Sequence, residues 1–388
     1  MDIGNTAVQK LRVLIISTVP GPNQNDFFFE LSRCSNLDLK VWYMGKRGAK
    51  WHGSESDPRY PHKFLTNIVP SAEKSGLFLN PGIVWHLFTS HYDCVIVQGY
   101  YAPSNAIAMI FLSMMKKIWI FWGEMVNRSQ DNSGWRYVLK KLILGNILSH
   151  SATLILVVGG ESARASYLKF GCHSDNIASL PYSCNLEHYF QLSDDQLELL
   201  SKLRHLYTSC HEKVIFSLAQ LIPRKCIHIL IQAFIKLNPV ENNLRLLIGG
   251  DGPEKDNLKS LVPQTLQDKV SFLGFLPKKD QPAYYNLADL FVLPSKEDGW
   301  GMVIIEALAS GTPVVTTTGV LSSSELIRDG INGFVVEPEN VNQLLQALEK
   351  GLVLAESIDQ HAIRENAKIC DSRVAARNLE YILLKKIG

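Results

Sequence analysis

Three acidic residues lie close together in the segment 295–306, SKEDGWGMVIIE. Glu297 and Asp298 are adjacent, and seven residues separate Asp298 from Glu306. A carboxylate can accept two hydrogen bonds from vicinal hydroxyl groups, such as those of a ribose. We therefore expect Glu306 to face a cleft and bind a ribose, with Asp298 near the other end of the same ligand. Each acid taken alone is equally typical of a solvated helix surface.

The same segment also combines glycines with a predicted helix start. An apolar run typical of a strand, 287–295, precedes Gly299 and Gly301. The first N–H groups of a helix have no partner within the helix and attract anions. The N–H groups of Gly301, Met302 and Val303 are thus candidate phosphate ligands at the carboxyl edge of a sheet.

A pair of cations supplies the opposite charge. Arg224 and Lys225 lie in a loop after the predicted strand 213–220. A guanidinium can bind two phosphate oxygens and an ammonium acts as a point charge, so this pair could neutralise a diphosphate. An Arg-Lys pair before a helix is also a common solvated feature.

Glycines follow two further predicted strands. Gly250 belongs to LIGGDGPE, which alone is a weak dinucleotide-like pattern. Gly274 belongs to VSFLGF, and its main chain is expected close to a flat base. Each glycine is compatible with a structural role as well as with binding.

These candidate residues require parallel sheets to position them. Continuous apolar runs that alternate with helical patterns are typical of parallel sheets buried on both faces. The predicted strands of the first half are 11–17, 37–44, 93–99, 117–123 and 153–159. Those of the second half are 213–220, 243–250, 269–275, 287–295, 312–317 and 332–338.

The pattern predicts an α/β protein with two doubly wound, Rossmann-like domains that face each other across a cleft. A chain of 388 residues, 46% of them hydrophobic, is too long for one ordinary core. We expect the first domain in 1–187 and the second in 188–372. The last helix, 373–388, is expected to pack back on the first domain.

Charge and cysteine content indicate the kind of partner and the redox compartment of the protein. Residues 1–185 hold 18 Lys and Arg against 12 Asp and Glu, whereas 186–388 hold 21 against 25. A basic first half suits an anionic partner or bilayer, although an ordinary basic face explains it equally. Seven scattered cysteines without a C-x-x-C pair favour a reducing compartment.

The localisation expected from the sequence is cytoplasmic. The first residues lack the basic start and cleavage site of a signal peptide. The most apolar stretch is interrupted by Lys116 and Lys117, so a transmembrane span is not expected.

Taken in order, the motifs AQLIPRK, LIGGDGPE, VSFLGFLP, SKEDGWGMVIIEALASGTPVV and DGINGFVVEP resemble the C-terminal half of GT-B retaining glycosyltransferases of family 4, also called group 1. The resemblance covers roughly residues 214–340. It is specific as an ensemble and much weaker over the first half.

The resemblance implies that 1–187 form an acceptor-binding domain and 188–372 a nucleotide-sugar domain. It also implies roles for individual residues. In that family the second acid of an acid-x7-acid signature holds the nucleotide ribose, which corresponds to Glu306. The first acid contacts the donor sugar, which corresponds to Asp298, where Glu is usual; the adjacent Glu297 could take over this role. The cation that contacts the distal phosphate corresponds to Lys225.

Two departures from the family affect this transfer. Where members often carry Gly-Arg, this chain has Ala219 and Gln220. Gln220 remains a candidate donor contact, but its neutral amide cannot replace the positive charge of the arginine, which Arg224 is expected to supply from the loop. In the first half, the position of a frequent histidine is taken by Trp122-Gly123-Glu124. Glu124 is a candidate for orienting the acceptor hydroxyl, with a structural role equally open.

The implied chemistry is transfer of a hexose-like sugar from a UDP- or GDP-type donor to an acceptor hydroxyl, with retention of configuration. No cofactor is expected, and no metal site, because the chain has no D-x-D triplet. The negative charge of the departing diphosphate is then stabilised by the cations and the helix start.

The expected acceptor is a saccharide or a lipid-linked saccharide, as in polysaccharide or glycolipid assembly, and no nucleic-acid partner is expected. The segment 133–150 mixes Trp135, Tyr137 and aliphatic residues with Arg136, Lys140 and Lys141. That mixture is typical of an interfacial helix, and equally of a core helix with a basic outer face. Peripheral contact with the inner face of an anionic membrane is therefore one expectation.

Two other functions are compatible with such a chain. A GT-B nucleotide-sugar epimerase would need acid and base groups beside the sugar. A non-catalytic partner-binding or membrane-binding homologue would explain the departures from the family pattern.

Overall fold

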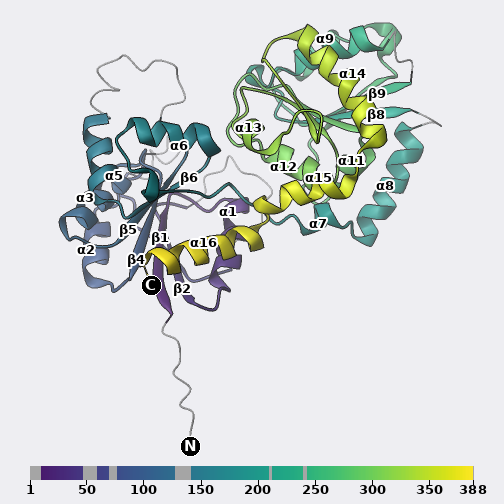
Figure 1. Ribbon diagram of the computed structural model, residues 1–388. Helices are drawn as coiled ribbons and strands as arrows, with labels where there is room; N and C mark the ends of the chain where they lie inside the picture. Colours follow the sequence, from purple (N-terminus) through teal and green to yellow (C-terminus); the bar gives the residue numbers. More distant parts are fainter. Residues whose placement is uncertain are drawn as a thin grey trace, which may run out of the picture. The chain divides into compact units, whose positions relative to one another are not determined.

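The computed structural model describes residues 10–46, 59–69, 77–126, 141–208, 212–238 and 243–387. The chain forms two compact units. Unit 1 comprises Met1–Asn185 together with Cys370–Gly388, and unit 2 comprises Leu186–Ile369. Each unit contains one parallel sheet with helices on both faces (Figure 1).

The sheet of unit 1 has seven described strands in the order β3-β2-β1-β4-β5-β6-β7. Neighbouring strands are parallel throughout. The strands are β1 (Leu11–Ser17), β2 (Leu37–Tyr43), β3 (His62–Phe64), β4 (Cys94–Gln98), β5 (Trp119–Gly123), β6 (Leu154–Val157) and β7 (Ile177–Ser179). The five predicted strands are confirmed. The edge strands β3 and β7 were missed, because three residues are too few to form a recognisable apolar run.

Helices cover this sheet on both sides. They are α1 (Pro22–Ser32), α2 (Gly82–Thr89), α3 (Pro103–Met114), α5 (Asn146–Ser151), α6 (Gly160–Lys169) and α16 (Ser372–Ile387). A π-helical segment, Lys141–Gly145, leads into α5. The side of the sheet that faces α2, α3, α5 and α6 holds a continuous core with Trp119 and Phe121 at 0% exposure.

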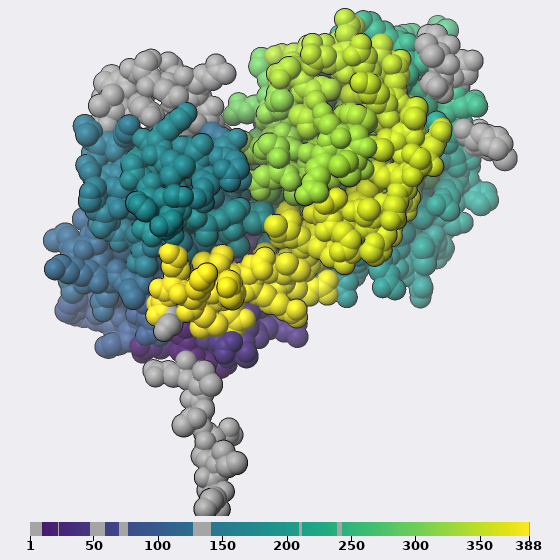
Figure 2. All heavy atoms as spheres, viewed as in Figure 1, coloured from purple at the N-terminus to yellow at the C-terminus, as the bar shows by residue number. Residues whose placement is uncertain are grey.

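The last helix belongs to unit 1. Helix α16 packs along α1, and its Glu380 carboxylate accepts hydrogen bonds from the main-chain N–H and the side-chain amide of Asn36, each at 3.1 Å. Figure 2 shows the yellow surface of α16 covering the purple N-terminal part of the unit. The chain thus completes unit 1 only after passing through unit 2.

The sheet of unit 2 has six described strands in the order β10-β9-β8-β11-β12-β13, again all parallel. They are β8 (Lys213–Leu218), β9 (Leu244–Gly249), β10 (Val270–Gly274), β11 (Leu290–Leu293), β12 (Val314–Thr317) and β13 (Gly333–Val336). All six predicted strands are confirmed, and so is the prediction of two doubly wound parallel sheets.

The principal helices of unit 2 are α7 (Glu187–Phe190), α8 (Asp194–Tyr207), α9 (Ile227–Leu237), α10 (Lys255–Ser260), α11 (Gln281–Leu287), α12 (Met302–Ala309), α13 (Ser323–Leu326), α14 (Val341–Ser357) and α15 (Gln360–Ala367). Helices α9 and α14 pack together and build one core with the sheet. Among the described residues, no helix is both long and apolar enough to cross a bilayer.

Both sheets change their winding direction between two central strands. In unit 1 this point lies between β1 and β4, and in unit 2 it lies between β8 and β11. Loops that leave such a pair at their carboxyl ends diverge to opposite faces and open a crevice, where α/β proteins bind ligands. The predicted cations follow β8 and the predicted acids follow β11, so the fold places both sets at this point.

Two glycines let main-chain segments approach closely at this edge. A Cβ atom on Gly250, whose φ is +116°, would lie 1.8 Å from the carbonyl oxygen of Ala219. A Cβ atom on Gly319 would lie 2.1 Å from the carbonyl oxygen of Lys296. Any larger residue would therefore displace the loops that carry the site.

Candidate functional site

The structure brings both predicted cations onto one predicted acid. The Lys225 ammonium donates to Oδ2 of Asp298, and Nη1 of Arg224 lies 3.3 Å from Oδ1 of the same carboxylate. Arg224 also donates to the carbonyl oxygen of Glu297 at 3.0 Å. Lys225 is 8% exposed, so this ion pair is largely shielded from solvent.

Local main-chain structure fixes these groups. A 3₁₀ turn, Pro223–Lys225, ends at Cys226, whose φ of 50° turns the chain into α9. The N–H of Lys296 donates to the carbonyl oxygen of Arg224 at 2.8 Å and so joins the cationic loop to the acidic loop. The N–H of Asp298 donates to the Gly319 carbonyl at 3.0 Å.

A helix start lies beside the acidic loop. Gly301 has a φ of +68°, and α12 begins at the next residue, Met302. A Cβ atom on Gly301 would lie 2.7 Å from Cγ1 of Val320, so both the conformation and the space require glycine here. Met302 and Val303 are half-buried and belong to the first turn, whose N–H groups point out of the helix end.

Glu306 lies in a different environment from Asp298. It is 5% exposed, and its Oε2 accepts a hydrogen bond of 3.0 Å from the hydroxyl of Tyr285 on α11. Burial raises the pKa of Glu306, although the positive charge of Lys278 and the hydroxyls of Tyr285 and Tyr189 act in the opposite direction. The carboxylate that was expected to face a cleft is largely buried beside Tyr285 of α11, and its binding of a ribose stays a prediction.

The remaining predicted donor contacts are spread along the same edge of the sheet. Gln220 is exposed after β8, and the Glu297 side chain is exposed after β11. The N–H of Gly250 donates to the Gly274 carbonyl at 2.7 Å, which joins the ends of β9 and β10. Gly274 has a φ of +72° and open space where a side chain would lie.

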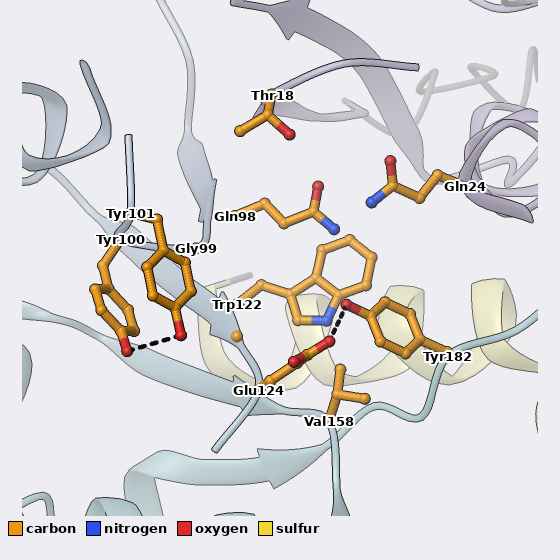
Figure 3. Close-up of a pocket in the computed structure, with 11 residues that line it drawn as sticks. Thr18, Gln24, Gln98, Gly99, Tyr100, Tyr101, Trp122, Glu124, Val158 and Tyr182 are labelled. Atoms are coloured by element: carbon orange, nitrogen blue, oxygen red, sulfur yellow. Dashed lines mark hydrogen bonds between the residues drawn. The ribbon is translucent and has the colours of Figure 1, made fainter. Parts of the chain in front are cut away.

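Unit 1 has a pocket at the carboxyl ends of β1, β4, β5 and β6, with a volume of about 240 Å³ (Figure 3). The predicted Glu124 lies in it. Its Oε1 accepts a hydrogen bond of 3.0 Å from the hydroxyl of Tyr182, and its carbonyl oxygen accepts one of 2.6 Å from Tyr167. The carboxylate is therefore held at a defined position in the pocket wall.

The rest of the pocket is built from rings and amides. Tyr100 and Tyr101 have ring centroids 4.3 Å apart, and the indole of Trp122 lies beneath the side-chain amides of Gln24 and Gln98 in Figure 3. None of the described residues that line the pocket is Lys or Arg. Such a lining suits an uncharged polyhydroxylated ligand, whose C–H faces contact rings and whose hydroxyls bind amides.

Sequence reasoning did not identify two tyrosines that hold the carboxylates. Tyr285 precedes Glu306 by 21 residues, and Tyr182 follows Glu124 by 58 residues. Tyr285 meets Glu306 because α11 packs against α12. Tyr182 meets Glu124 because the segment after β7 passes beside the end of β5. A buried carboxylate needs a hydrogen-bond donor, and this requirement was the one indication in the sequence that such partners exist.

Other predicted features are only partly visible. In the described part of the chain no group of three or more His, Cys, Asp or Glu side chains could hold a metal ion. Of the predicted interfacial segment, Trp135, Arg136, Tyr137 and Lys140 lie outside the described residues, whereas Lys141 is described and exposed.

Comparison with solved structures supports the fold of the whole chain. The crystal structure of HepE from Anabaena in complex with UDP superposes with a TM-score of 0.70 at 19% identity, covering 97% of this chain and 100% of that one. The lipopolysaccharide outer core galactosyltransferase WaaB, in its apo form, gives a TM-score of 0.68 at 13% identity, with coverage of 97% and 100%.

Sequence comparison identifies a family in unit 2. Residues 208–369 match the family described as "Glycosyl transferases group 1". O-antigen chain mannosyltransferase B of Escherichia coli is 32% identical over 207 residues, which are 51% of this chain and 52% of that protein. Alpha-monoglucosyldiacylglycerol synthase of Streptococcus pneumoniae is 30% identical over 178 residues, 45% and 40% of the two chains.

The chain spans about half the length, or less, of these curated relatives. Its residues 208–369 nevertheless contain the cations, the acids and the helix start of unit 2, and the superpositions extend over both units. This protein therefore has the GT-B fold, and residues 208–369 of its second unit match the glycosyl transferases group 1 family.

Proposed function

We propose that this protein is a retaining glycosyltransferase that moves a hexose-like sugar from a nucleoside diphosphate donor to a hydroxyl of a saccharide or lipid-linked saccharide. The group 1 domain supports the reaction class. Similar proteins named for mannosyl transfer to O-antigen chains and for glucolipid synthesis support the acceptor class. The UDP in the HepE structure supports the donor class.

One observation carries the donor site: an anion already lies between the two cations. Lys225 and Arg224 both contact the carboxylate of Asp298, which lies four residues before Met302, the first residue of α12. A diphosphate offers the same charge-assisted bonds with more oxygens, and it adds contacts with the N–H groups of the helix start. In the proposed complex the diphosphate replaces Asp298 as the partner of Lys225, and Asp298 turns to the sugar hydroxyls.

The rest of the donor follows the same edge of the sheet. The ribose reaches Glu306, whose carboxylate Tyr285 keeps in place. The base lies against the open main chain at Gly274, and Gln220 borders the intervening space. Glu297 offers a second carboxylate beside Asp298.

In the proposed reaction the acceptor oxygen bonds to the anomeric carbon as the bond from that carbon to the phosphate oxygen breaks. Negative charge grows on the leaving diphosphate, where Arg224, Lys225 and the α12 start stabilise it. The leaving phosphate oxygen takes the acceptor proton from the same face, so configuration is retained without a protein nucleophile. This scheme needs no metal ion.

We place acceptor binding in the pocket of unit 1. Glu124 can accept a hydrogen bond from an acceptor hydroxyl and so orient it, while Tyr182 fixes the carboxylate. The rings of Tyr100, Tyr101 and Trp122 provide surfaces for a sugar ring.

A panel of nucleotide sugars tests the donor site. UDP-, GDP- and ADP-linked hexoses are mixed with the protein, and the Tm is recorded; a bound donor raises it by mass action. Lys225→Met removes one cation of the site, and Lys296→Met, an exposed lysine of the adjacent loop, serves as the matched control. We expect a Tm increase in the wild type and the control that is lost in Lys225→Met. A donor that stabilises all three proteins equally would contradict the site.

A second measurement tests the reaction itself. The stabilising donor, labelled in its sugar, is incubated with the protein and a membrane extract, and the anomeric configuration of the product is read by NMR. Transfer with retention, absent in Glu306→Ala, supports the proposal. Donor conversion without any acceptor would indicate an epimerase, and donor binding without turnover would indicate a non-catalytic protein.

A further inference from the structure

Large apolar side chains are exposed on one helix layer of unit 1. Trp85 is 66% exposed and Met114 is 77% exposed, values typical of polar surface residues. The exposed apolar side chains of this layer include Trp85, Phe88, Ile110, Met114, Leu142 and Ile143. We call the surface that they form on α2, α3 and the segment 141–145 the α2–α3 face.

The three elements are neighbours. Helix α2 packs on α3, α3 packs on α5, and the segment 141–145 leads directly into α5. In Figure 1 these helices lie side by side along one side of the unit 1 sheet. Their other sides carry the core, through residues such as Leu87, Met109 and Leu148. The exposed residues therefore belong to the outer surface of a single layer.

Such exposure indicates that another molecule covers this surface. A contiguous apolar patch on a protein surface marks a site of contact with a protein or a membrane. The rings of Trp85 and Phe88 lie 6.4 Å apart, centroid to centroid, and form the largest group on α2. Exposed Trp and Phe beside aliphatic residues are typical of surfaces that enter the boundary region of a bilayer.

Among the described residues of α2, α3 and the segments that follow them on this face, the charges have one sign. Lys116 and Lys117 follow Met115 after the end of α3, Lys141 is the first residue of the segment 141–145, and all three lysines are exposed. The stretches 81–92, 103–118 and 141–152 contain no Asp or Glu. An apolar surface edged by cations and free of acids complements a bilayer with anionic headgroups.

We propose that the α2–α3 face docks on an anionic lipid bilayer, with Trp85, Phe88 and Met114 entering the headgroup boundary and the three lysines contacting lipid phosphates. A second copy of the chain fits this surface less well, since a twofold contact would bring the lysines of both copies together. This inference goes beyond the proposed reaction and does not depend on it.

Sedimentation with lipid vesicles tests the apolar part of the proposal. The full chain is mixed with vesicles of 30% phosphatidylglycerol in phosphatidylcholine, or of phosphatidylcholine alone, at about 0.1 M salt. We expect binding to the anionic vesicles, and a loss of roughly tenfold or more in Trp85→Ser/Phe88→Ser because two rings no longer leave water. The matched control is Leu206→Ser/Val353→Ser, which removes two equally exposed apolar side chains from unit 2.

A second variant tests the charges. In Lys116→Gln/Lys117→Gln/Lys141→Gln, binding to anionic vesicles should fall by about fivefold for each lysine removed, and added salt should have less effect on what remains. The control Lys202→Gln/Lys259→Gln/Lys350→Gln removes the same charge from exposed positions of unit 2. All of these positions lie on the surface, so circular dichroism and the Tm should match the wild type.

Three results would overturn the proposal. One is the absence of sedimentation with anionic vesicles. Another is equal binding by the wild type and both α2–α3 face variants. The third is a dimer, seen by light scattering, that Trp85→Ser/Phe88→Ser converts to monomer, which would assign the face to a second copy. Because donor binding lies in unit 2, the nucleotide-sugar panel reports on the proposed function separately.

Discussion

The carboxyl edges of the two sheets have the same architecture and different chemistry. In unit 2 the edge presents Arg224, Lys225, Asp298 and the start of α12. In unit 1 it presents aromatic rings, amides and the single carboxylate of Glu124, with no Lys or Arg among the described lining residues. One topology thus carries a cationic loop beside an acid in one unit and a lining without Lys or Arg in the other, and we propose a diphosphate for the first and a neutral polyol for the second.

The carboxylates of the two edges are held in two different ways. Two cations neutralise Asp298, whereas tyrosine hydroxyls hold Glu124 and Glu306. An ion pair can exchange partners when a stronger anion arrives, but a carboxylate anchored by a hydroxyl keeps its position. The first arrangement suits the binding of a diphosphate and the second suits the orientation of a hydroxyl group.

The largest effect should come from removing a cation of unit 2. Lys225→Met should weaken binding of the diphosphate form of the best donor by about 100-fold, because a shielded ammonium is lost from an anion site. Isothermal titration calorimetry measures the affinity.

The neighbouring Lys296→Met is the control for that change. Lys296 pairs with Glu339 and is well exposed, so its loss should change the affinity by less than about twofold. Equal losses in the two variants would mean that net charge, and not the geometry at Asp298, governs binding.

The next largest effect should come from unit 1 and should leave the donor untouched. Glu124→Gln should lower kcat/KM for the acceptor by about 100-fold, because a neutral amide accepts a weaker hydrogen bond from the reacting hydroxyl. The nucleotide Kd should stay within about twofold of the wild type. Glu161→Gln, at the exposed start of α6, is the control. A matching loss of nucleotide affinity would contradict the assignment of the acceptor to unit 1 and of the donor to unit 2.

A smaller change should follow from loosening Glu124 without removing its charge. Tyr182→Phe deletes the hydroxyl that donates to Oε1, so kcat should fall by roughly fivefold to tenfold while the KM for the acceptor changes little. The exposed Tyr381→Phe on α16 should have no effect. A change in KM with kcat intact would show that Tyr182 binds the acceptor and does not position Glu124.

The smallest effect concerns stability and pH. Burial raises the pKa of Glu306, so the native state holds this proton more tightly than the unfolded chain and loses stability as the pH rises from about 4.5 through the raised pKa. Glu306→Gln does not titrate, and it should raise the Tm by a few degrees at pH 7.5, with the difference shrinking toward pH 4.5.

The exposed Glu297→Gln is the control for the pH series, since its carboxylate is in contact with solvent. Thermal unfolding followed by circular dichroism at several pH values gives both curves. A constant Tm difference across the pH range would show that ionised Glu306 is not disfavoured in the folded protein.

The sequence predicted the sheets well because buried parallel strands are continuous apolar runs. Helix α9 (Ile227–Leu237) is similarly regular, because its core side is uniformly apolar. The acids and cations were found because loops after strands of one parallel sheet gather at one edge. Local pattern and topology were sufficient for these features.

Side-chain partnerships were beyond the reach of local pattern. The Lys225–Asp298 contact joins residues 73 positions apart, and the enclosure of Glu306 depends on how α11 packs on α12. Exposed apolar residues on α2 and α3 are indistinguishable in sequence from core residues of the same helices. Such features arise from tertiary packing, which periodicity does not encode.

The route of the chain has a consequence for its synthesis. Helix α16 covers α1, yet it is translated only after all of unit 2 has emerged. Through that interval the newly made unit 1 leaves the outer side of α1 bare on the ribosome, so a nascent chain stalled before Ser372 is a natural client for chaperones.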